Sequence, residues 1–189
     1  MSQCDIEEAD LRMSAYLLDA LQKWARTMVI STEDTDVLVI LCGQFFNLKT
    51  SFPQIELWVA FGTGKHYKEY HINSICETLG AVKSMALPYF HAYSGCDSTS
   101  QFNGKGKRSA WEAWKSFPEV TEAFISIAAP PFELLEIDSL TFKLLERYTC
   151  VLYSKTAHED CVNELRKGLF SQKSQTMENI PPSKVSSLL

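Results

Sequence analysis

The sequence predicts an α/β fold, in which a short and mostly parallel central sheet is flanked by helices and followed by a helical C-terminal region. Three observations predict this fold. Apolar residues recur with a helical period near the start of the chain, short β-branched apolar runs bounded by polar residues come next, and the rest has helical periodicity. Strands separated by helices imply layers of helix packed on sheet.

The predicted elements follow one another along the chain. Residues 11–27 form an amphipathic helix, and the acidic sequence EEAD lies at its N-terminal end, where negative charge is favoured. The apolar runs MVI at 28–30, VLVILC at 37–42 and IELWVAF at 55–61 are typical of buried strands. Helices are predicted over 71–80, 81–93 with a break or bend near Pro88, 107–117, 118–129, 132–154 and 158–170.

Composition divides the chain into three regions. Residues 1–129, which include a loop and helix start at 95–110, form the predicted core domain. Pro130-Pro131 breaks the chain before a helical extension over 130–171. Residues 172–189 have few core-forming side chains and are predicted to be a flexible tail.

Charge and cysteine usage exclude several classes of protein. The 189 residues carry a net charge of −5, so any grip on nucleic acid must come from a local basic patch. The six cysteines contain no CxxC pair, which argues against a zinc knuckle and fits a reducing compartment. The N-terminal sequence is acidic, and no apolar run approaches the roughly 20 residues of a membrane span. We therefore expect an intracellular protein, nuclear or cytoplasmic, with no membrane partner.

Paired acidic residues indicate a candidate metal site. Asp34 and Asp36 flank Thr35 directly before the predicted strand at 37–42, where alternate residues of an extended chain point to one side. Glu8 and Asp10 form a similar pair. Carboxylates brought together repel one another unless cations neutralise them, and hard oxygen ligands suit Mg²⁺ or Mn²⁺. The alternative interpretation is that these residues are turn and helix-start residues, solvated and structural.

A glycine-rich basic loop is the second candidate site. It contains Gly104, Lys105, Gly106, Lys107 and Arg108 and directly precedes a predicted helix. Backbone N–H groups at a helix start attract phosphate, and the basic side chains add charge. The spacing is not that of a nucleotide-binding P-loop. The alternative interpretation is a solvated basic turn.

The acidic pairs and the basic loop together resemble the flap endonuclease family of structure-specific nucleases, which has a PIN-like fold. Glu8-Ala9-Asp10 is similar to the family's Glu-Ala-Glu motif, Glu33-Asp34-Thr35-Asp36 to its strand-end motif, and Gly95-Cys96-Asp97 to its Gly-Cys-Asp motif. From Asp97 to Ala110 the spacing of Gly104, Gly106 and Arg108 also agrees. A longer stretch, from Glu7 to Trp114, resembles uncharacterised animal proteins of mobile-element type.

The resemblance implies a function and a set of site residues. It implies a Mg²⁺- or Mn²⁺-dependent nuclease-like domain that hydrolyses phosphodiester bonds of branched or single-stranded DNA. The Gly-x-Gly hairpin at 104–106 would hold a monovalent cation, and residues 104–108 would bind the DNA backbone. The implied catalytic residues are Asp34, Asp36 and Asp97, and the implied metal ligands are Glu8, Asp10, Asp34, Asp36 and Asp97.

The chain departs from the family at its N-terminal end. Only seven residues precede Glu8, so the family's first strand and its metal-binding Asp have no counterpart, and the arch that threads the flap is missing. We expect either a truncated protein or one that works without these parts. Two further readings stay open: a non-catalytic nucleic-acid-binding module, and a protein-interaction module that uses the helix with Trp111 and Trp114. Core packing is the alternative role for these tryptophans.

Overall fold

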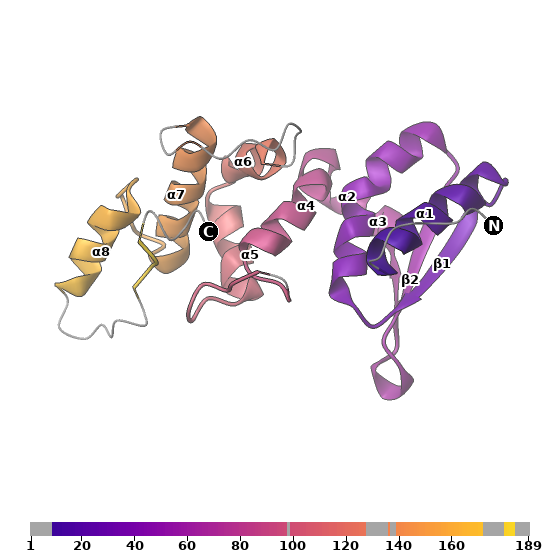
Figure 1. Ribbon diagram of the computed structural model, residues 1–189, viewed down its shortest axis with the longest axis horizontal. Coiled ribbons are helices and arrows are strands. Elements are labelled where there is room, and N and C mark those ends of the chain that lie inside the picture. Colours follow the sequence, from indigo (N-terminus) through magenta and orange to yellow (C-terminus); the bar gives the residue numbers. More distant parts are fainter. Residues whose placement is uncertain (1–8, 98, 128–135, 137–138, 172–179, 184–189) are drawn as a thin grey trace. The chain divides into compact units, whose positions relative to one another are not determined.

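The computed structural model describes residues 9–97, 99–127, 136, 139–171 and 180–183 (Figure 1). The chain divides into two compact units, residues 1–88 and residues 89–189. The predicted boundary at residue 129 lies outside the described residues, as do residues 172–179 and 184–189 of the predicted tail. Within the described part of that tail, Ile180 packs against buried residues of the helix Val162–Phe170, and the Pro181 carbonyl accepts a hydrogen bond from the Arg166 guanidinium group.

The first unit is a small mixed sheet with helices, in the order α1 (Ala9–Gln22), β1 (Thr27–Thr32), α2 (Thr35–Ser51), β2 (Glu56–Phe61), η1 (Gly64–His66), β3 (Lys68–His71) and α3 (Ile72–Leu79). The sheet has three strands in the order β1-β2-β3, with β1 and β2 parallel and β3 antiparallel to β2. The α/β class is therefore confirmed, and the predicted strands at 28–30 and 55–61 correspond to β1 and β2.

The predicted strand at 37–42 is wrong, because these residues belong to helix α2. The apolar run is short enough to fit either structure, and its continuation decides between them. Asp34 caps the helix, and buried side chains recur at helical spacing well past residue 42. The buried residues of α2 are Val37, Leu41, Cys42, Phe45 and Leu48. The short elements η1 and β3 were not predicted.

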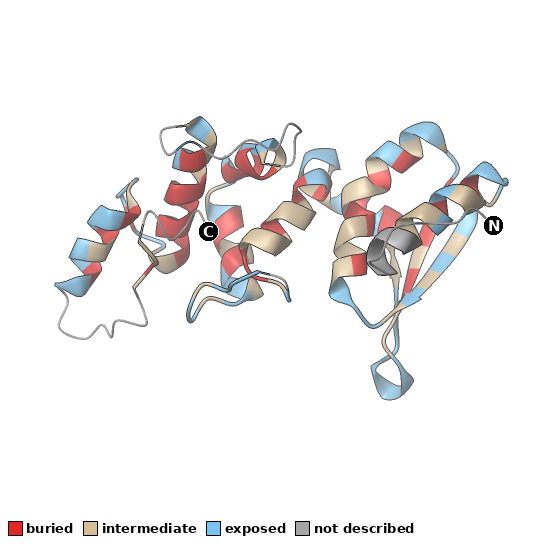
Figure 2. Cartoon of the chain, viewed as in Figure 1, coloured by how far each residue is buried: buried red, intermediate tan, exposed pale blue. Residues whose placement is uncertain are grey.

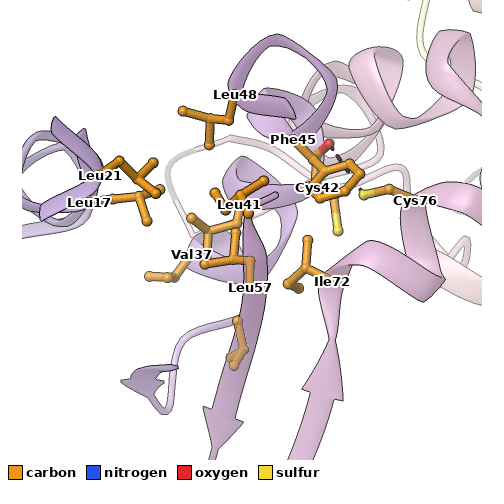
Figure 3. Packing of buried hydrophobic residues seen from close by; sticks show 12 residues of the cluster. Leu17, Leu21, Val37, Leu41, Cys42, Phe45, Leu48, Leu57, Ile72 and Cys76 are labelled. Atoms are coloured by element: carbon orange, nitrogen blue, oxygen red, sulfur yellow. Dashed lines mark hydrogen bonds between the residues drawn. The ribbon is translucent and has the colours of Figure 1, made fainter. Parts of the chain in front are cut away.

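The core of the first unit lies between α2, α1, the sheet and α3. Leu17 and Leu21 of α1 point toward α2, and Leu57 of β2 and Ile72 of α3 approach it from the sheet side (Figure 3). Cys42 and Cys76 are both fully buried in this core, and the Cys76 thiol donates to the Cys42 carbonyl at 3.6 Å.

Helix α4 (Ala81–Tyr93) continues through Pro88, which lies inside it. Within the first unit, a Cβ atom on Gly43 of α2 would come within 2.5 Å of the Pro88 ring. Glycine at position 43 therefore allows the close approach of α2 and α4, since any side chain there would have to displace the proline ring.

The second unit is helical and has an aromatic core. It contains the end of α4 and the helices α5 (Lys107–Ser116), α6 (Val120–Ser126), α7 (Leu140–Tyr153) and α8 (Val162–Phe170). These agree with the predicted helices, although the predicted start of the helix at 132–154 lies largely among residues that are not described. The rings of Phe90 and Trp114 stack with their centres 4.7 Å apart, and those of Phe124 and Tyr148 pack edge-on with their centres 5.6 Å apart. Figure 2 shows α7 as a mostly buried helix.

Candidate functional site

The structure describes the five predicted metal ligands to different extents and places them in different parts of the chain. Glu8 lies outside the described residues, and for Asp10 the structure describes only the backbone, in the first turn of α1. Asp34 and Asp36 belong to the first unit, whereas Asp97 lies in the loop after α4 and belongs to the second unit. The predicted five-carboxylate site thus stays a prediction.

Asp34 and Asp36 lie at the carboxyl end of β1. Asp34 is exposed and caps α2, since one of its carboxylate oxygens accepts the Asp36 backbone N–H at 2.8 Å. Its own N–H donates to the Thr32 hydroxyl at 3.0 Å. Asp36 is in the first turn of the helix. The expectation that both side chains project from one extended segment is therefore wrong, because the helix begins between them.

The correction moves this pair to a more favourable position for ligand binding. The pair follows β1 instead of preceding a strand, and β1 is parallel to β2. The Gly62 N–H at the end of β2 donates to the Thr32 carbonyl at 2.9 Å, so both strands end at the same edge. Ligands of open α/β sheets bind outside the carboxyl ends of the strands. Helix α1 runs opposite to β1, which directs its N-terminal turn toward this edge (Figure 1).

The described residues supply only part of a divalent cation site. Over the part of the chain that the structure covers, no group of three or more His, Cys, Asp or Glu side chains is arranged to hold a metal ion. Asp34 and Asp36 offer carboxylate oxygens at the edge, but one oxygen of Asp34 is already engaged in capping. Two carboxylates do not by themselves make a two-metal centre.

The loop from Ser94 to Gly106 is held in place by its own hydrogen bonds. The Thr99 hydroxyl donates to the Ala92 carbonyl at 2.7 Å and accepts the Cys96 N–H at 3.0 Å. Gly95 has a φ of 94°, and a Cβ there would overlap Gln101. The loop then turns through Gly104, which has a φ of 68°. It reaches α5 through Gly106, which precedes the first helical residue, as the sequence predicts.

The basic residues of this loop have different surroundings. The ammonium group of Lys107 donates to the His91 carbonyl and, at 2.9 Å, to the Ser94 hydroxyl, so this side chain ties α5 to the end of α4. That placement favours a structural role over the predicted contact with DNA. Arg108, one residue further on, is exposed.

A cavity of about 290 Å³ lies between the first turns of α5 and the end of α7. Lys105, Arg108 and Lys155 supply positive charge to its lining, and Glu112 supplies one carboxylate. The Lys105 ammonium group lies 4.9 Å from the centre of the Tyr153 ring. Burial lowers the pKa of Lys105 below its ordinary value. A partly desolvated cation next to an exposed arginine favours the binding of an anion.

Lys155 was missed in the sequence because it lies far along the chain from the glycine-rich loop. The Tyr148 hydroxyl donates to the Ala110 carbonyl at 2.9 Å and fixes α7 against α5. This contact brings the turn after α7, with Lys155, to the loop. A basic residue directly after a predicted helix is a weak signal on its own.

Of the two tryptophans of α5, Trp114 belongs to the core and Trp111 is half-buried. Trp114 is buried, with 1% of its surface exposed, and its indole N–H donates to the Thr121 hydroxyl at 2.8 Å. Trp111 packs edge-on against Phe90 at 5.6 Å. Core packing is confirmed for Trp114. This residue is therefore not available to the interaction surface that the sequence suggested on this helix.

The comparisons with known proteins give no family for the chain. No protein-family model, no curated protein and no solved structure matches it. No helix within the described residues is both long and apolar enough to cross a membrane.

Proposed function

We propose that this chain is a nuclease-like domain that binds DNA, and that its second unit contacts the phosphate backbone. The observation that carries the proposal is the basic cavity beside the Gly104–Gly106 loop. Arg108 would bind a phosphate through paired N–H groups, and Lys105 and Lys155 would neutralise the charge around it. The N–H groups at the start of α5 add the positive end of a helix dipole.

A direct binding assay tests the proposal. Fluorescence anisotropy would measure the affinity for labelled single-stranded and branched DNA at several salt concentrations. We expect Arg108→Ala and Lys155→Ala each to weaken binding about tenfold and to lower the salt slope by about one. Lys143→Ala is the matched control, because this exposed lysine of α7 does not line the cavity. Equal affinities for all three variants would contradict the proposal.

Metal-dependent hydrolysis of the DNA backbone is a second candidate function. It is supported by the position of Asp34 and Asp36 at the carboxyl end of β1, next to the end of β2. We expect cleavage of branched or single-stranded DNA in Mg²⁺ or Mn²⁺, with losses of more than about a hundredfold in Asp36→Asn and Asp97→Asn. Asp19→Asn, a partly exposed residue of α1 that pairs with Lys23, is the control. DNA binding without cleavage would leave the non-catalytic function standing.

A further inference from the structure

The outer edge of β1 is an unpaired sheet edge among the described residues. The strand order is β1-β2-β3, so β1 has a partner on one side alone. The carbonyl groups of Arg26 and Thr32 accept N–H groups from the β2 side, at 2.7 Å and 2.9 Å. Because the backbone groups of successive residues point to opposite sides of a strand, those between them alternate between β2 and the open edge.

Thr27, Val29 and Ser31 therefore present their N–H and C=O groups to the open edge. The side chains of these residues are exposed as well, and 65% of Val29 is accessible. Figure 2 shows the ribbon of β1 alternating between exposed and intermediate residues, without a buried one. The edge thus offers hydrogen-bonding groups and an apolar side chain together.

The edge also lacks the features that usually keep strands from pairing. The sequence TMVIST contains no charged residue and no proline. Its register with β2 runs without a bulge from Thr27 to Thr32. Natural edge strands are commonly protected by charge, proline, bulges or shortness, and a flat apolar edge is a template for another strand.

Trp24, which closely precedes β1, gives an independent indication. It is 88% exposed and has a φ of 73°, a left-handed conformation that is unfavourable for a bulky residue. The Ala25 N–H donates to the Ala20 carbonyl at 3.1 Å, so Trp24 occupies the helix-ending position usually filled by glycine. A large apolar side chain held in this strained position, largely exposed to solvent, fits a contact with another molecule.

The charges at the two ends of β1 indicate the nature of that partner. Arg26 is exposed at the start of the strand, and Glu33 and Asp34 are exposed at its end. Two such strands placed antiparallel bring the basic end of each beside the acidic end of the other. A parallel arrangement would place like charges together, which is unfavourable.

We propose that two copies of this chain associate through antiparallel pairing of their β1 strands, which joins the two sheets into one. The register that pairs all outward-facing residues sets Val29 opposite Val29 of the partner subunit, and Thr27 opposite Ser31 of the partner subunit. Residues opposite one another then share a face of the sheet, as antiparallel pairing requires. In this register Arg26 lies beside the acidic end of the partner's strand.

Sedimentation equilibrium of the full chain over a wide concentration range tests the proposal. The expected result is a reversible dimer. Val29→Lys, which places a charge on the open edge, should weaken association at least about tenfold. Arg26→Glu should weaken it by roughly tenfold, because attraction between the strand ends becomes repulsion, and Glu33→Arg should weaken it less, because attraction is lost but Asp34 remains. Lys65→Glu, an exposed residue of η1, makes the same change of charge as Arg26→Glu and should leave association unaltered.

Mixing the two charge variants provides the sharpest test. Arg26→Glu has two acidic strand ends, whereas Glu33→Arg keeps its basic start and its new positive charge offsets Asp34 at the other end. An equimolar mixture should therefore form a mixed dimer more strongly than either variant associates with itself. Circular dichroism melting of each variant checks that the fold is kept. A wild-type chain that stays monomeric, a dimer unaffected by Val29→Lys, or a mixture that stays monomeric would each overturn the proposal.

Discussion

Lys107 and Arg108 are neighbours in the sequence but have opposite surroundings. The Lys107 ammonium group is held by the end of α4, whereas Arg108 is exposed and lines the basic cavity. A composition-based argument counts both as one basic patch. At the scale of single residues, hydrogen bonds that form only in the folded chain decide which charge is available to a ligand, and no local spacing predicts them.

Asn73 provides a test of the residue scale. Its amide oxygen accepts the Leu57 N–H at 3.0 Å, and its amide nitrogen donates to the Ile55 carbonyl at 2.8 Å, both in a buried setting. Asn73→Ala should lower the free energy of unfolding by roughly 2–4 kcal/mol, because two buried backbone groups lose their partner. Urea unfolding measures the change. Asn47→Ala, on the exposed side of α2, should change it by less than about 0.5 kcal/mol.

The buried Tyr93 side chain should make the stability of the fold depend on pH. Its hydroxyl lies 2.9 Å from that of Thr149, and burial raises the pKa of Tyr93 to about 12. Because the pKa of Tyr93 is higher in the folded state, the neutral hydroxyl contributes fully to the stability of the fold below the unfolded pKa of about 10. This contribution is lost as pH rises toward 12. The free energy of unfolding should therefore fall over this range, and less steeply in Tyr93→Phe. Tyr16→Phe, at an exposed position of α1, should retain the wild-type slope.

At the scale of elements, α1 and α3 both end at a residue with a positive φ, and only that of α3 is glycine. Gly80 ends α3 with a φ of 80°, and a Cβ there would meet nothing within 4 Å. Trp24 ends α1 with a φ of 73°, which is also positive, without being glycine. We expect Gly80→Ala to lower the free energy of unfolding by about 1–3 kcal/mol, because a φ of 80° with a ψ of 160° suits essentially only glycine, and Trp24→Gly to raise it by about 1 kcal/mol. Thermal melting measures both, and a destabilised Trp24→Gly would contradict the assignment of strain.

The sequence predicted elements best where periodicity was long. The helices over 81–93 and 107–117 agree with α4 and α5, and the apolar runs at 28–30 and 55–61 became strands. The run at 37–42 became a helix because the pattern that separates the two structures lies beyond it. β3 has exposed and intermediate residues only, and its pairing with β2 is a tertiary contact that no local pattern contains.

The candidate sites were predictable to a different degree. Gly106 precedes a helix, as the spacing predicts, whereas Asp34 follows β1 and caps α2 instead of preceding a strand. Lys155 enters the cavity only through the packing of α7 on α5. Distant partners of this kind follow from tertiary structure, which a single sequence does not reveal.

At the scale of the whole molecule, the two proposed surfaces belong to different units. The basic cavity lies in the second unit and the β1 edge in the first. We expect Arg108→Ala to leave the dimer dissociation constant unchanged, and Val29→Lys to leave the DNA affinity per subunit unchanged, measured by sedimentation and anisotropy respectively. A variant that changes both would show that association and DNA binding are coupled.

The burial of the cysteines has a practical consequence for labelling. Cys42, Cys76 and Cys150 are buried, whereas Cys96 and Cys161 are partly accessible. Burial raises the pKa of Cys150 to about 12, which further suppresses its thiolate. Among the described cysteines, maleimide reagents should therefore modify the two accessible thiols first. Cys96 lies in the loop that leads to Gly104–Gly106, so a fluorophore there, with Cys4 and Cys161 replaced by serine, would report on ligand binding without an introduced cysteine.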